Sequence, residues 1–72
     1  MERKKLIRIE ELLELTGQSR SGLYGKIAKN EFPRPVSLGV RAKAWVLGEV
    51  IDWIEAAIAR RDADQITSQE MA

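Results

Sequence analysis

Residues 15–29 read LTGQSRSGLYGKIAK and contain the strongest indications of how the chain folds. Gly17 is a typical end of one helix, and Ser19 is a good N-cap for the next, because its hydroxyl can accept a hydrogen bond from a free amide of the first turn. Leu23 and Ile27 lie four residues apart and predict the inward side of a second helix, which runs to the end of the stretch. Two helices joined by a short turn that contains glycine predict a helix-turn-helix.

The residues before this turn predict a short amphipathic helix over positions 6–15. Apolar residues return there at helical spacing and glutamates occupy the opposite side, as shown by Leu6, Ile9, Leu12 and Leu13 against Glu10, Glu11 and Glu14. Residues 2–5 are charged, and we expect residues 1–5 to form a flexible N-terminus.

The residues after the turn predict a β-hairpin. Residues 32–35 read FPRP, and the two prolines exclude continued helix. Short strands are predicted over residues 36–38 and 42–46, with Arg41 at the tip of the hairpin between them.

A third helix is predicted from Leu47, because apolar residues then return every three or four positions. We expect it to end near Arg61, since residues 62–72 are polar, lack an apolar stripe and resemble a disordered tail. The predicted fold is therefore mainly α: a small winged helix over residues 6–61, made of a helix-turn-helix, a two-stranded wing hairpin and a C-terminal helix. Its core is expected to contain Trp45, Trp53 and Phe32 with the aliphatic anchors.

Composition limits the chemistry that the chain can perform. Its 72 residues make one domain at most and include neither cysteine nor histidine. Disulfides, zinc clusters and the commonest general base are therefore excluded, and we expect no metal or cofactor. No nucleophile with a base, carboxylate pair with a pocket or phosphate-cradling glycine loop can be identified, so we do not expect an enzyme. No signal peptide or membrane-spanning segment is evident, which predicts a cytoplasmic protein.

The formal net charge of +1 conceals an uneven distribution of charge. Residues 18–46 contain six lysines and arginines and one acidic residue, a net charge of +5, whereas the rest of the chain carries −4. A basic middle between acidic helices suits a protein that presents one face to phosphate.

The chain also resembles a known family. The motifs T-G-x-S-R-S at residues 16–21 and F-P-x-P-V-x-L-G at residues 32–39 are similar to those of the AlpA prophage regulators, as are Arg41, Trp45 and Trp53. Phage excisionases and the DNA-binding domain of MerR-type regulators are more distantly similar. The resemblance covers roughly residues 6–58 and implies a winged helix that binds DNA and regulates or performs the excision of integrated elements.

The predicted DNA surface follows from a winged helix in which the second helix enters the major groove and the wing lies on the adjacent backbone or minor groove. Hydroxyls and amides at the helix start can bind a phosphate. Arginines can bind a guanine edge or a phosphate, and lysines can bind phosphates. The tyrosine is expected to pack its ring inward and to direct its hydroxyl toward backbone oxygen. The candidate residues are Ser19, Arg20, Ser21, Tyr24, Gly25, Lys26, Lys29, Arg41 and Lys43.

Two glycines depart from the family pattern. The family usually has arginine at the position of Gly25 and a residue other than glycine at Gly22. Ser21, Gly25 and Ala28 are predicted to form the most outward face of the second helix, which therefore carries almost no side chains. Close approach of the helix backbone to DNA and simple tolerance of the glycines both remain open explanations.

The leading functional hypothesis is a sequence-preferring regulator of transcription that binds double-stranded DNA. An excisionase-type architectural factor is an alternative that uses the same fold and surface. A protein-interaction module, whose acidic helices dock a recombinase, is a second alternative. The expected partners are double-stranded DNA and, beyond it, an integrase or RNA polymerase, with a homodimer or cooperative assembly on DNA.

Overall fold

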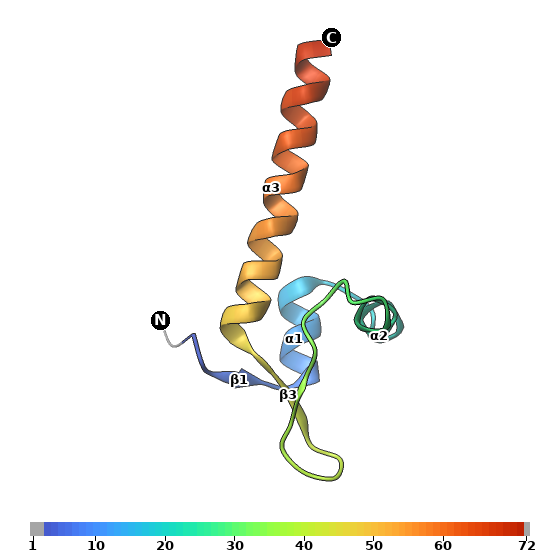
Figure 1. Ribbon diagram of the computed structural model, residues 1–72, viewed down its shortest axis with the longest axis vertical. Helices are drawn as coiled ribbons and strands as arrows, with labels where there is room; N and C mark the ends of the chain where they lie inside the picture. The colour runs from blue at the N-terminus through green and yellow to red at the C-terminus, as the bar shows by residue number, and fades with distance from the viewer. Residues whose placement is uncertain (1–2, 72) are drawn as a thin grey trace.

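The computed structural model describes residues 3–71 and has the predicted winged-helix architecture (Figure 1). Three helices and a small antiparallel sheet whose strand order is β1-β3-β2 make up the fold. The elements in chain order are β1 (Leu6–Ile7), α1 (Ile9–Thr16), α2 (Arg20–Ala28), β2 (Val36–Ser37), β3 (Lys43–Val46) and α3 (Leu47–Met71).

The first strand corrects the predicted start of the first helix. Leu6 and Ile7 belong to β1, where they pair with Val46 and Trp45 of β3, and α1 begins only at Ile9. The apolar spacing of residues 6–13 is compatible with a helix, but pairing with a distant strand overrides this local preference. The hairpin therefore gains a third strand that the sequence did not predict.

The helix-turn-helix is formed by the predicted capping residues. Gly17 adopts a left-handed φ of 69° and its amide donates to the Leu13 carbonyl, which ends α1. The Ser19 hydroxyl accepts a hydrogen bond of 3.1 Å from the Gly22 amide and caps α2. Asn30, at a left-handed φ of 59°, follows the end of α2.

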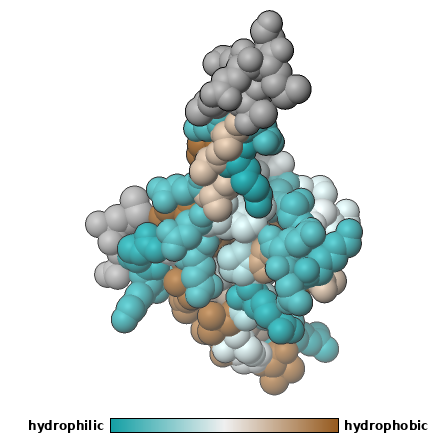
Figure 2. Space-filling model, turned by 45° about the horizontal axis from the view of Figure 1, so that its top comes forward, coloured by the Kyte–Doolittle hydropathy of each residue, from teal (hydrophilic) through white to brown (hydrophobic). Residues whose placement is uncertain are grey.

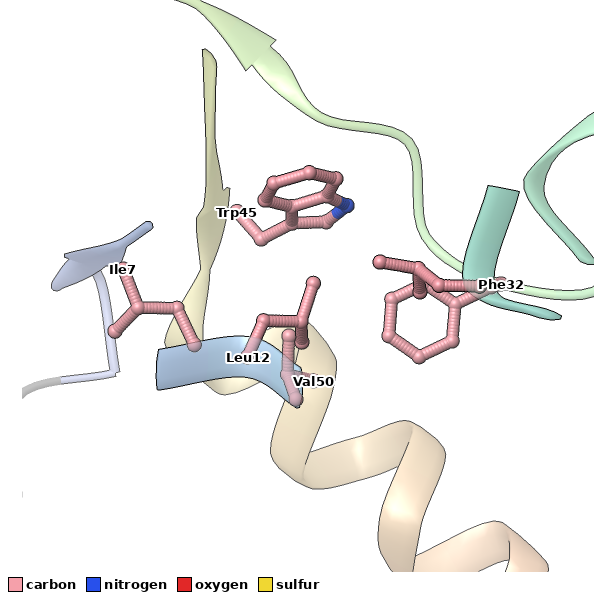
Figure 3. Close-up of a cluster of buried hydrophobic side chains, with 6 residues drawn as sticks. Ile7, Leu12, Phe32, Trp45 and Val50 are labelled. Carbon is pink, nitrogen blue, oxygen red and sulfur yellow. The ribbon is translucent and has the colours of Figure 1, made fainter. Parts of the chain in front are cut away.

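The core lies where the sheet meets the three helices (Figure 3). The Trp45 ring of β3 lies over Leu12 of α1 and Val50 of α3, with Ile7 and Phe32 on either side. All five side chains are at least 97% buried, as is Leu23. Burial of these side chains supplies most of the hydrophobic stabilisation available to so short a chain.

The two tryptophans also hold the segment that joins α2 to β2. The Trp45 indole N–H donates to the Pro33 carbonyl at 3.1 Å, and the Trp53 indole N–H donates to the Glu31 carbonyl at 2.8 Å. Phe32 meets Trp53 edge to face, with ring centroids 4.9 Å apart. Trp53 is only half-buried, so Trp45 is the central aromatic residue of the core.

The N-terminal segment contacts the start of α3. The amides of Leu47 and Gly48 donate to the carbonyls of Lys5 and Arg3, at 2.7 and 2.8 Å. These bonds satisfy amides that a helix start otherwise leaves unpaired. The Arg3 guanidinium also lies 2.8 Å from the Asp52 carboxylate. Arg3 and Lys5 of the expected flexible N-terminus thus have defined partners, and residues 1–2 lie outside the described residues.

The last helix is longer than predicted. It begins at Leu47 as expected, but it continues to Met71 and projects from the rest of the molecule (Figure 1). The predicted end near Arg61 is therefore wrong. The disordered tail expected over residues 62–72 remains a prediction for the chain in solution, and Ala72 lies outside the described residues.

Candidate functional site

A basic hollow of about 300 Å³ lies between the hairpin and the starts of α1 and α2. Four cationic side chains from three separate parts of the chain line it: Arg8 before α1, Arg20 at the first position of α2, and Arg41 and Lys43 of the hairpin. Its other lining residues are Ile9, Glu10, Tyr24 and Trp45. Four cations and a single carboxylate give the hollow a positive potential that favours an anionic ligand.

The hairpin contributes to this hollow through one face of β3. Lys43 and Trp45 alternate with Ala44 along the strand, so their side chains point to the same side of the sheet. Trp45 is buried and fixed by its bond to Pro33, whereas Lys43 is exposed. The buried indole therefore anchors the strand, and Lys43, two residues before it on the same side, carries an exposed cation to the hollow.

The outward face of α2 carries small residues, as predicted. Ser21, Gly25 and Ala28 are exposed. A Cβ built on Gly25 has no neighbouring atom within 4 Å, whereas one built on Gly22 lies 3.0 Å from the Ser19 hydroxyl. Gly22 thus lies under the helix cap, and Gly25 faces open space where another molecule can approach the backbone.

The structure brings together some of the candidate residues and separates others. The basic hollow is lined by Arg20, Tyr24, Arg41 and Lys43. Ser21 and Gly25 are exposed on α2, and Ser19 is exposed at the N-cap before it. Lys26 lines a different hollow of about 720 Å³ beside Phe32, Trp53 and Arg60. Lys29 is exposed directly after α2.

Two charged residues of the hollow were missed by the sequence analysis, Arg8 and Glu10. Arg8 precedes α1 with an extended backbone, and its carbonyl accepts from the Leu12 amide. Its position depends on β1, which the sequence did not predict, so no local signal distinguished it from the other N-terminal cations. Tyr24 is 44% exposed, so its ring is only partly packed inward.

Neither a metal cluster nor a membrane-spanning helix is found in the described part of the chain. Among these residues no cluster of three histidine, cysteine, aspartate or glutamate side chains is arranged to hold a metal ion. No helix within residues 3–71 has the length and apolar character needed to cross a membrane.

The fold and the hollow define a small winged-helix protein with a cationic site between its helix-turn-helix and its wing. The chain belongs to the family of the prophage CP4-57 regulatory protein, AlpA, whose model matches residues 5–58. The resemblance noted in the sequence is therefore confirmed. The description of this family names a regulatory protein and no catalysed reaction.

A phage protein is also similar to the chain. An uncharacterized protein of Enterobacteria phage P4, ORF88, is 43% identical over 58 residues. The match covers 81% of this chain and 66% of the phage protein, just under two thirds of its length. No solved structure matches the chain.

Proposed function

We propose that the chain is a sequence-preferring regulator of transcription that binds double-stranded DNA. The observation that carries the proposal is the convergence of Arg8, Arg20, Arg41 and Lys43 on one hollow. Gathering like charges in so small a domain is unfavourable unless a ligand neutralises them, and the phosphates of a duplex do so.

In the proposed complex α2 enters the major groove and the wing lies on the adjacent backbone or minor groove. The exposed α2 face of Ser21, Gly25 and Ala28 suits close approach of the helix backbone to DNA. Arg41 on the hairpin suits a narrow minor groove, whose negative potential attracts arginine. Arg8 and Lys43 neutralise phosphates between these two contacts.

The proposal is tested by alanine substitutions at Arg20 and Arg41, each assayed by titration with duplex DNA at physiological salt. We expect each substitution to weaken binding about tenfold, or 1.4 kcal/mol, while the melting temperature stays unchanged. The matched control is Arg60→Ala, because Arg60 is an exposed arginine that lines the other hollow. Full affinity in both hollow variants would exclude this surface.

Footprinting across the genetic element that encodes the chain separates regulation of transcription from excision. Protection of a promoter is the result expected for a transcriptional regulator. Protection confined to an attachment site would instead assign an architectural role in excision. No protection at any concentration that saturates the protein would favour docking to a recombinase or another protein partner.

A further inference from the structure

The second hollow of the molecule lies on the other side of α2 from the basic hollow. Its volume is about 720 Å³, and its lining residues come from the end of α2, from the segment that joins α2 to β2, and from α3. Each residue of a helix advances about 100° around the axis, so Lys26, which lines this hollow, points about 160° away from Tyr24, which lines the basic one. We call this second site the aromatic hollow.

The apolar part of the aromatic hollow is held in place by its own bonds. Phe32 is 3% exposed and meets Trp53 edge to face, beside the half-buried Pro33. The Trp53 indole N–H donates to the Glu31 carbonyl at 2.8 Å, and the Glu31 amide donates to the Lys26 carbonyl at 2.8 Å. The one donor of the indole is therefore already bonded, and the ring offers carbon surface to a ligand. A lining that is fixed in advance binds with a smaller loss of entropy.

The cations of the aromatic hollow have no ion-pair partner within the chain. Lys26 is half-buried and Arg60 is exposed, and neither forms an ion pair with any residue that the structure describes. The Glu31 carboxylate also lines the hollow but pairs with neither cation. Two cations and one carboxylate leave a net charge of +1, which favours an anionic group beside the aromatic rings.

The hollow extends along an exposed stretch of α3. Trp53 and Arg60 both line it, and they lie about 10 Å apart along the helix, a distance that an extended segment of roughly three residues spans. The turn between them carries Ala56 and Ala57, whose small side chains leave room for a ligand. Figure 2 shows hydrophobic and hydrophilic surface side by side on α3, next to the end of the helix that is drawn in grey.

From this arrangement we infer that the aromatic hollow binds a short segment of a partner protein that carries a carboxylate next to an apolar side chain. The apolar side chain packs on Trp53, and the carboxylate pairs with Lys26 or Arg60. The backbone of DNA fits this hollow less well, because it has no apolar group to cover the indole and its phosphates would meet the Glu31 carboxylate.

Occupation of the aromatic hollow leaves the basic hollow free, because Lys26 and Tyr24 point to opposite sides of α2. One chain can therefore hold DNA and a protein segment at the same time. This last consequence rests on the proposed function, whereas binding of the segment does not.

The inference is tested by selecting a random peptide library, displayed on yeast, for binding to the full chain without DNA. Enriched peptides should carry aspartate or glutamate beside an aromatic or aliphatic residue. Replacing the carboxylates of the tightest peptide by amides should weaken its binding about tenfold. The inference would be overturned if no peptide were enriched, or if the amide peptide bound equally well.

Charge reversal in the chain locates the bound peptide. Lys26→Glu and Arg60→Glu should each weaken binding of the acidic peptide about tenfold, because attraction is replaced by repulsion. The matched control is Lys29→Glu, which makes the same change at an exposed residue outside the hollow and should alter binding by no more than about twofold.

Equal losses in all three variants would reduce the effect to net charge and overturn the assignment of the site. The hollow would belong to the DNA surface instead if the peptide bound all variants equally and Lys26→Glu weakened binding of duplex DNA more than Lys29→Glu did. Failure of the chain to bind DNA at all would leave the peptide measurements unchanged, so the two proposals fail separately.

Discussion

The two faces of β3 carry opposite chemistry although their residues alternate along one strand of four residues. On the inner face Trp45 fills the core and Lys43 continues into the basic hollow. On the opposite face lie Ala44, which is buried, and Val46, which is half-buried. A strand of four residues can therefore contribute both a charged side chain to the basic hollow and apolar side chains to the fold, because successive side chains point to opposite sides.

The largest expected difference between the faces is in stability. Trp45→Ala should lower the free energy of unfolding by about 3–5 kcal/mol, because it removes a large ring that is 1% exposed at the centre of the core. Leu38→Ala, at a position of the hairpin that is 49% exposed, should change it by no more than about 0.5 kcal/mol. Urea denaturation of both variants makes the measurement. Similar losses for the two would show that Leu38 is part of the folding core.

The attachment of β1 to α3 sets the next largest effect. A Cβ at Gly48 would lie 2.8 Å from the Arg3 carbonyl oxygen, so Gly48→Ala must displace the segment that leads into β1. We expect a loss of about 1–3 kcal/mol in the free energy of unfolding, as for other overpacked sites. Gly39→Ala is the matched control, since its Cβ would meet only the Ala42 side chain at 3.9 Å. Equal thermal stability of the two variants would contradict this role of Gly48.

The smallest expected effect concerns the bare face of α2. Gly25→Ala should raise the free energy of unfolding by roughly 0.5–1 kcal/mol, because its Cβ meets open space and alanine favours the helix. Gly22→Ala should gain less, since its Cβ would crowd the Ser19 hydroxyl that caps the helix. If the backbone approaches DNA closely at Gly25, the same methyl group should also weaken binding.

Thermal denaturation and a DNA titration of Gly25→Ala distinguish close approach of the backbone to DNA from simple tolerance of the glycine. Higher stability together with weaker binding supports close approach. Unchanged affinity with higher stability would leave Gly25 as a tolerated glycine. Gly25→Arg adds a side chain that can reach base edges, and it should strengthen binding or shift sequence preference.

The sequence predicted the elements that depend on neighbouring residues. Gly17 and Ser19 form the turn between α1 and α2 through hydrogen bonds to residues a few positions away. The prolines before the hairpin also act locally, because they exclude continued helix. β1 was missed because its partners, Trp45 and Val46, lie in a distant part of the sequence. The length of α3 was missed because residues 62–71 have no apolar stripe to indicate a helix.

The residues of the candidate site were also predicted only in part. Arg20, Arg41 and Lys43 occupy positions that the motif and the hairpin tip indicate, and the structure places them around one hollow. Arg8 reaches that hollow only because β1 fixes the start of α1 beside the hairpin. Lys26 belongs to the same helix as Arg20 but lines a different hollow, together with Trp53 and Arg60 of α3.

The salt dependence of DNA binding is the most direct test of whether the basic hollow binds the phosphates of DNA. If the four cations of the hollow neutralise phosphates, the logarithm of the association constant should fall with the logarithm of salt concentration with a slope of about −3 to −4. Arg8→Ala should reduce the steepness of that slope by about 0.9, and Arg60→Ala should leave it unchanged. A slope near zero for the wild-type chain, or the same slope after Arg8→Ala, would contradict the assignment of the basic hollow to DNA.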